Sequence, residues 1–132
     1  MYKIAKEKFG FQLTFEERVS LDEMKQWKEE SKKALVGARG SFGVLIDMRT
    51  LRPGGIQAEA QAVLVEGQGL YKKAGMERSC VILQSALIAM QFQRLAKESG
   101  IYAFERYIDA STHPDWRTKA IAWLENKIDP DL

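Results

Sequence analysis

Residues 2 to 15 alternate between apolar and polar side chains, which is the pattern of β-strands with one buried face. A polar turn at Lys6, Glu7 and Lys8 divides the alternation into two short runs, so the segment predicts a hairpin. The period of two predicts one shared sheet face for four large residues: Phe9, Phe11, Leu13 and Phe15.

Two later segments contain almost no polar residues. FGVLIDM, from Phe42 to Met48, and CVIL, from Cys80 to Leu83, are apolar runs of strand length. Such runs are typical of strands that are buried on both faces, and these are usually central and parallel. A weaker alternation over 101–108 predicts one more strand, which is less deeply buried.

Two helices have clear start signals. The first begins at Ser20, where Glu23 has the capping-box spacing, and it is expected to end in a left-handed turn at Gly37. Another runs from Ala86 to Ser99, with Ser85 as its cap. The apolar residues of both segments recur three and four positions apart, as on one face of a helix.

Two further helices are predicted. The segment from Ile56 to Gly75 contains Gly67 and Gly69, which indicate either close packing against a neighbour or a local break. The last helix is expected to have Ser111 or Thr112 as its cap and Pro114 in its first turn. Its expected core face consists of Trp116, Ala120, Trp123, Leu124 and Ile128.

Helices that alternate with buried strands predict an α/β fold. The expected architecture is a single layered domain over residues 1–132. It has a mostly parallel central sheet of about five strands, an antiparallel hairpin at the amino-terminal edge of this sheet, and four helices.

Composition excludes several function classes. The 20 basic and 18 acidic residues leave a net charge of +2, so no nucleic-acid partner is expected. One cysteine and one histidine provide no metal-binding set, and no cofactor is expected. No apolar stretch is long enough to span a bilayer or typical of a secretory signal, so the sequence predicts a cytoplasmic location.

The loop that follows the strand at 42–48 is the first candidate site. Ligands of parallel sheets bind beyond the carboxyl ends of the strands, and the next helix directs free amides toward this loop. Two arginines add positive charge and two glycines allow close backbone approach, so a phosphate, a carboxylate or an acidic partner could bind. The alternative is a plain turn with two solvated arginines. The candidate residues are Arg49, Thr50, Arg52, Gly54 and Gly55.

Five local patterns accompany this order of elements: VSLDE at 19–23, VLIDMR at 44–49, AGMERSCVIL at 74–83, ERYIDAS at 105–111 and AIAWLE at 120–125. Together they resemble the STAS domain, and more narrowly its stage II sporulation protein AA-like branch, which is grouped with lipid-binding SEC14-type domains. The resemblance covers nearly the whole chain. The closing strand and the helix with Ala-Trp-Leu are its most specific part.

The resemblance implies a non-catalytic domain that binds a regulatory protein partner through residues 49–55 and the helix after them. Many STAS domains are phosphorylated on a Ser or Thr where this helix starts. The present chain departs from that pattern, because Thr50 is the only hydroxyl in the loop and lies several residues before the helix.

A second hypothesis is a carrier or sensor of a small lipid or other apolar ligand, with peripheral contact to a membrane surface. The helix over 86–95 is apolar around most of its circumference, which is typical of a sandwiched helix or of a binding surface. An ordinary buried crossover helix is the alternative. Apolar helices and a free strand edge also allow a homodimer. The candidate ligand residues are Leu87, Met90, Phe92, Gly67 and Gly69.

A third, remote hypothesis is a hydrolase. Asp47, Ser85 and His113 lie on three loops that are expected to meet at one edge of the sheet. Ser85 lacks the G-x-S-x-G pattern that exposes a hydrolase serine, and it is equally explained as a helix cap. Asp47 is equally explained as a structural carboxylate paired with Arg49 or with a loop amide.

Overall fold

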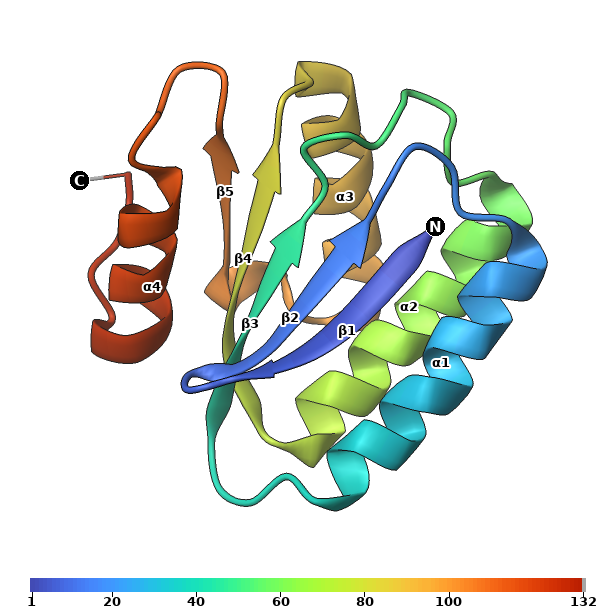
Figure 1. The fold of residues 1–132 in the computed structure, drawn as a ribbon, viewed down its shortest axis with the longest axis horizontal. Helices are drawn as coiled ribbons and strands as arrows, with labels where there is room; N and C mark the ends of the chain where they lie inside the picture. The colour runs from blue at the N-terminus through green and yellow to red at the C-terminus, as the bar shows by residue number, and fades with distance from the viewer. Residues whose placement is uncertain (132) are drawn as a thin grey trace.

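The computed structural model describes residues 1–131, which form a five-stranded sheet with helices on both faces (Figure 1). The strands are β1 (Tyr2–Glu7), β2 (Gly10–Phe15), β3 (Phe42–Asp47), β4 (Met76–Leu83) and β5 (Glu105–Asp109). They lie in the sheet in chain order. Only the β1–β2 pair is antiparallel among these strands, so the predicted α/β fold with an antiparallel hairpin at its edge is confirmed.

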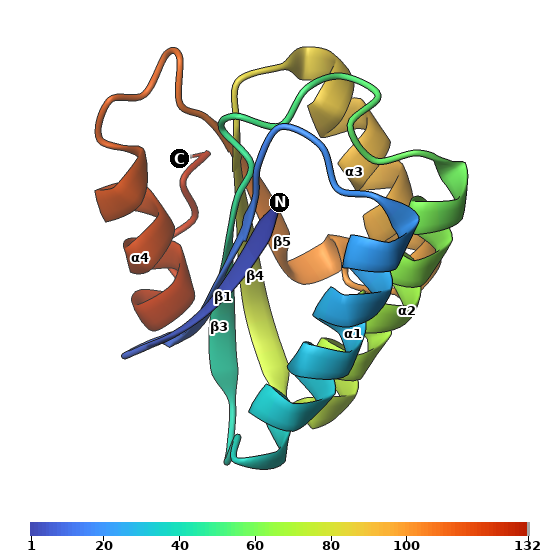
Figure 2. The same cartoon turned by 45° about the vertical axis from the view of Figure 1, so that its right-hand side comes forward.

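In the described part of the chain, four α-helices cover the sheet: α1 (Leu21–Val36), α2 (Ala58–Ala74), α3 (Ala86–Ser99) and α4 (Trp116–Asn126). Figure 2 shows α1, α2 and α3 on one face and α4 on the other. Since each of the first three helices follows a parallel strand, their amino-terminal ends gather at the carboxyl edge of the sheet. Within residues 1–131, no helix has the length and apolar character that crossing a membrane requires.

The core between the sheet and α1–α3 is built around the indole of Trp27. This ring stacks on Tyr71 with centroids 5.9 Å apart and meets the edge of Phe15 at 5.6 Å. A Cβ atom at Gly67 would lie 2.1 Å from Cζ3 of Trp27. Gly67 therefore marks close packing between α1 and α2, and α2 continues through Gly69 without a break.

The predicted burial of the central strands is confirmed, and one prediction at the hairpin is wrong. β3 lies between β2 and β4 in the sheet. Nearly every residue of β3 and most residues of β4 are buried. Phe9 does not share the face of Phe11, because it packs with the α4 side of the sheet while Phe11 packs with the α1 side. The reason is local: Phe9 belongs to the turn, and Gly10 has a φ of +146° that interrupts the alternation.

Two predicted boundaries are corrected around α1 and β5. Gly37 caps α1 in the right-handed region, with φ −86° and ψ −3°, and the left-handed glycine comes later, at Gly40. The segment predicted as a strand from residue 101 begins as a short 3-10 helix over Tyr102–Phe104, and β5 starts only at Glu105.

The ends of α4 also differ from the prediction. Its cap residue is Asp115, not Ser111 or Thr112. Ser111 instead bonds to the end of β5, because its backbone N–H and its hydroxyl both donate to Asp109 Oδ1, at 2.9 and 2.6 Å. Ile128 lies beyond the end of the helix and is exposed, so it does not belong to the core face.

Candidate functional site

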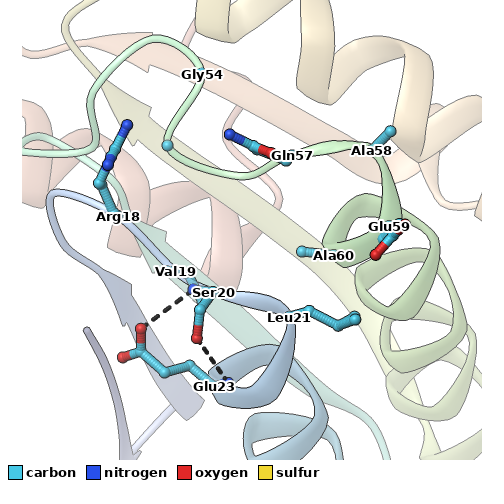
Figure 3. A pocket seen from close by; sticks show the side chains of 11 residues that line it. Arg18, Val19, Ser20, Leu21, Glu23, Gly54, Gln57, Ala58, Glu59 and Ala60 are labelled. Atoms are coloured by element: carbon cyan, nitrogen blue, oxygen red, sulfur yellow. Dashed lines mark hydrogen bonds between the residues drawn. The ribbon is translucent and has the colours of Figure 1, made fainter.

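A groove of about 500 Å³ opens between the amino-terminal ends of α1 and α2 (Figure 3). One wall is formed by residues from Arg18 to Glu23, where the chain leaves β2 and enters α1. The other wall is formed by residues from Gly54 to Ala60, where the loop after β3 enters α2. The two ends are neighbours because β2 and β3 are adjacent parallel strands.

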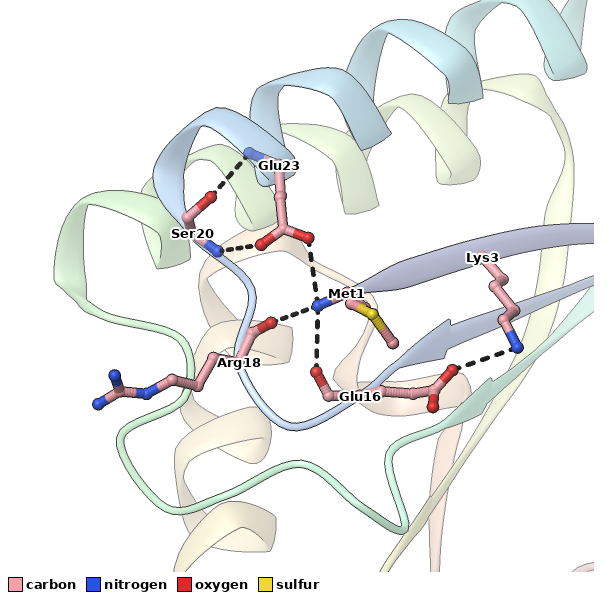
Figure 4. A network of polar contacts seen from close by, with 6 residues as sticks. All are labelled: Met1, Lys3, Glu16, Arg18, Ser20 and Glu23. Atoms are coloured by element: carbon pink, nitrogen blue, oxygen red, sulfur yellow. Dashed lines mark hydrogen bonds and ion pairs between the residues drawn. The ribbon is translucent and has the colours of Figure 1, made fainter.

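The amino-terminal end of α1, on one side of the groove, is capped by its own side chains (Figure 4). The Ser20 hydroxyl accepts from the backbone N–H of Glu23, and the Glu23 carboxylate accepts from the N–H of Ser20, each at 3.1 Å. The amino group of Met1 donates to the carbonyls of Glu16 and Arg18 and lies 3.2 Å from Glu23 Oε2. These contacts, the hydrogen bond from Ser20 first, hold the pKa of Glu23 below its usual value.

The α2 end of the groove has no such cap. Gln57 occupies the cap position with φ −82° and ψ 169°, and its side chain makes no capping hydrogen bond. The amides of Ala58, Glu59 and Ala60 find no acceptor among residues 1–131. First-turn amides carry the positive end of the helix dipole, so this end of α2 is open to an external acceptor.

Backbone hydrogen bonds join the two loops that support the groove. Val19 N donates to the carbonyl of Gly55 at 2.9 Å, and Arg52 N donates to the carbonyl of Glu17 at 3.0 Å. Glu17 N donates in turn to the carbonyl of Thr50 at 3.2 Å. A Cβ atom at Gly55 would lie 2.6 Å from the carbonyl oxygen of Glu17, so only glycine fits between these backbones.

Both arginines of the predicted anion site are already paired. Arg49 donates from Nε and Nη2 to the two carboxylate oxygens of Asp47, each at 3.0 Å, and its guanidinium lies 4.4 Å from the ring centroid of Trp116. The pairing with Asp47 raises the pKa of Arg49. Arg52 donates from Nε to Glu17 at 2.6 Å. Of the predicted set, Gly54 and Gly55 line the groove, whereas the arginines hold the loop.

The three residues of the hydrolase hypothesis are each bonded within their own loop. Asp47 is paired with Arg49, as its structural interpretation expects. Ser85 caps α3, where its hydroxyl accepts from the N–H of Ile88 at 3.3 Å. His113 Nδ1 lies 3.0 Å from the hydroxyl of Thr112. Between Asp47, Ser85 and His113 themselves the structure contains no hydrogen bond, so no nucleophile–base pair is assembled.

The candidate residues for an apolar ligand do not lie together. Leu87 and Met90 are 63% and 67% exposed on the outer side of α3, whereas Phe92 is buried beneath the same helix. Phe92 lines a cavity of about 20 Å³ between the sheet and the helices. That volume holds one water-sized group, so a lipid tail does not fit in this arrangement.

Sequence reasoning missed Glu105, a carboxyl that is 3% exposed. It accepts from Ser79 Oγ at 3.0 Å and from the Tyr107 hydroxyl at 2.5 Å. Burial raises the pKa of Glu105 to about 7. The only sequence signal was an acidic residue within a predicted strand, and that strand was expected to be less deeply buried.

Other chemistry is absent from the part of the chain that the structure describes. No group of three or more His, Cys, Asp or Glu side chains within residues 1–131 is placed to hold a metal ion. Cys80 is fully buried, and this burial raises the pKa of its thiol. Comparisons with protein-family models, curated proteins and solved structures gave no match.

Proposed function

We propose that this chain is a non-catalytic, STAS-like domain that binds a regulatory protein partner through the groove between α1 and α2. The observation that carries the proposal is the uncapped end of α2, which opens into that groove. The observed order of strands and helices supports the STAS-like assignment, because it is the order that the resemblance implies. A cytoplasmic location is part of the same proposal.

The partner is expected to present an acidic side chain. A carboxylate is the natural acceptor for the free amides of Ala58, Glu59 and Ala60. Arg18 also lines the groove, and it has no ion-pair partner among residues 1–131. Figure 3 shows Arg18 on the side of the groove away from Glu59, so the acid is expected between Arg18 and Gln57.

A substitution at the cap position tests this proposal. Gln57→Asp introduces a carboxylate that can accept from the first-turn amides, so it occupies the proposed site from within the chain. Gln26→Asp makes the same chemical change within α1, where the side chain is exposed and lies outside the groove, and serves as the control.

The experiment compares the immobilised wild-type protein with both variants. Each is exposed to extract of the cells that produce the protein, and retained proteins are identified by mass spectrometry. We expect a protein that the wild type and Gln26→Asp retain and Gln57→Asp loses. Equal retention by all three, or no retention above the bare matrix, would contradict the proposal.

A further inference from the structure

Positive charge gathers at the edge of the sheet where the parallel strands begin, at the opposite ends of α1 and α2 from the groove. Three segments meet there: the turn from β1 to β2, the loop from α1 to β3, and the carboxyl-terminal end of α2 (Figure 1). They contribute five exposed cations that have no ion-pair partner among residues 1–131. These cations, which we call the basic edge, are Lys6, Lys8, Lys33, Arg39 and Lys73.

Backbone contacts fix the three segments relative to one another. The N–H of Gly43, in β3, donates to the carbonyl of Phe9 in the β1–β2 turn at 2.7 Å. The N–H of Phe42 donates to the carbonyl of Gly75, directly after α2, at 3.2 Å. A Cβ atom at Gly75 would lie 2.6 Å from the carbonyl oxygen of Gly40, so the end of α2 and the loop before β3 are closely packed. The segments that carry the cations therefore form one connected surface.

Helix ends account for some of these cations but not for all. Lys33 and Lys73 lie in the last turns of α1 and α2, where a positive charge complements the helix dipole. Lys6, Lys8 and Arg39 lie outside the helices and have no such role. They line one hollow of about 290 Å³. Like charges that share a hollow repel one another, so an anion that enters it relieves this repulsion.

An exposed aliphatic side chain accompanies the cations. Val36, the last residue of α1, is 87% exposed, the largest exposure among the large apolar residues described. It lines a second hollow of about 270 Å³ together with Lys73. Lys32, the other cation of this hollow, is paired with Glu29 at 3.0 Å. Apolar residues from α1 and α2 complete the lining: Leu35, Leu70 and Ala74.

We propose that the basic edge, with Val36, is a docking surface for a membrane that contains anionic lipids. The cations contact the phosphate and carboxylate groups of the lipid headgroups, and Val36 enters the interfacial layer. Glu7 shares the first hollow with three cations, so the local charge remains positive. An aliphatic side chain among cations fits a lipid surface better than a purely ionic partner. This surface is separate from the groove and does not depend on the proposed function.

Vesicle sedimentation with the full chain tests the proposal. Vesicles of phosphatidylcholine and phosphatidylserine in equal parts are compared with vesicles of phosphatidylcholine alone. We expect binding to the anionic vesicles that weakens as salt is raised, and none to the neutral vesicles. Since each cation near an anionic surface contributes about fivefold in affinity, the double variant Lys8→Glu, Arg39→Glu should bind at least about 25-fold more weakly.

A second double variant is the matched control. Lys25→Glu with Lys119→Glu makes the same change in net charge near the starts of α1 and α4, at the opposite edge of the sheet, where neither lysine has an ion-pair partner among residues 1–131. It should bind the anionic vesicles nearly as well as the wild type, and so should Gln57→Asp, which alters only the groove. Equal losses in the two double variants would overturn the proposal, because binding would then follow net charge and not the basic edge.

Two further measurements separate a membrane from other anions. Val36→Ser keeps the charge but removes the aliphatic side chain, so it should weaken vesicle binding a few-fold; unchanged affinity would refute the role of Val36. Soluble polyglutamate offers carboxylates without a lipid surface. Binding of polyglutamate without binding of the anionic vesicles would assign the basic edge to an acidic protein, and absence of vesicle binding by the wild type would equally overturn the proposal.

Discussion

The amino-terminal ends of α1 and α2 are equivalent in the fold but opposite in chemistry. Each follows a parallel strand, and each has a cap residue in the extended conformation. At α1, Ser20 and Glu23 satisfy each other's backbone amides. At α2, the side chain of Gln57 accepts from no first-turn amide. The capped end of α1 contributes to stability, whereas the open end of α2 provides the donors that the proposed partner site requires.

The loops behind the two ends explain why the open end holds its shape. Residues 16–19 and 50–55 are joined by backbone hydrogen bonds, and the ion pair of Arg52 with Glu17 links them again. These contacts hold the loop before α2 in place, and with it the uncapped amides of the helix. Such preorganisation lowers the entropic cost of binding.

The largest expected effect comes from placing a side chain in the close backbone contact between Gly55 and Glu17, behind the open end of α2. Gly55→Ala places a Cβ atom 2.6 Å from the carbonyl oxygen of Glu17, where the backbone cannot give way. We expect a loss of about 2–3 kcal/mol in the free energy of unfolding. Urea denaturation of the variant measures it.

Gly54→Ala is the matched control for that change. Gly54 has a φ of +76° with open space around its Cβ position, so only backbone strain opposes the substitution. We expect about 1 kcal/mol of destabilisation. A loss at Gly54 equal to that at Gly55 would contradict the close-packing explanation.

Removing the cap of α1 is expected to have the next largest effect on the free energy of unfolding. Ser20→Ala removes the hydroxyl that accepts from Glu23 N, which costs about 1 kcal/mol of stability. Gln57→Ala removes no capping bond and should change the free energy of unfolding by only a few tenths of a kcal/mol, on the order of other exposed substitutions. Similar losses for the two variants, measured by thermal and urea unfolding, would remove the contrast between the ends.

Introducing a capping side chain at the open end of α2 should stabilise the protein. The backbone at Gln57 already has the extended geometry that a capping Asp requires, so Gln57→Asp is expected to add about 0.5–1 kcal/mol to the free energy of unfolding. Gln26→Asp is expected to give no gain, because Gln26 lies within α1, where aspartate caps no free amide. If Gln57→Asp gave no gain in urea unfolding, the first-turn amides of α2 would already have an acceptor.

The smallest expected effect is a pH dependence of stability that arises from Glu23 at the capped end of α1. The pKa of Glu23 is lowered in the folded protein, so its ionised form contributes stability above the pKa of an unfolded glutamate. This contribution is lost as pH falls through the folded pKa. Glu23→Gln should therefore be less stable than the wild type at pH 7 and should approach it at pH 3, as unfolding measured at both values would reveal. An unchanged difference between the two proteins would contradict this assignment.

Local signals explain which parts of the fold could be predicted from the sequence. The apolar runs marked β3 and β4, and the spacing of Ser20 and Glu23 marked the start of α1. Ser85 at the start of α3 is also a local signal, and its role as the cap is confirmed. Each of these depends on neighbours within a few residues.

Contacts between distant residues explain what could not be predicted. Arg52 pairs with Glu17, which lies 35 positions earlier in the chain. The sequence pattern gave no sign of this pair, so Arg52 was predicted to be available for an anion or for solvent. Trp27 packs on Gly67 from a different helix, and Glu105 is buried by its partners on other elements and on its own strand. The groove itself depends on two loops that meet only in the folded protein.

The central claim is that the uncapped first turn of α2, and not the capped first turn of α1, binds an acidic partner. The most direct test is a ¹⁵N–¹H NMR titration with a blocked acidic peptide, acetyl-Asp-Glu-Asp amide, against its neutral analogue acetyl-Asn-Gln-Asn amide. We predict that only the acidic peptide shifts the amides of Ala58, Glu59 and Ala60. The amides at the start of α1 should not move, and Gln57→Asp should abolish the response. Equal shifts at both helix ends, or shifts that persist in Gln57→Asp, would contradict the account.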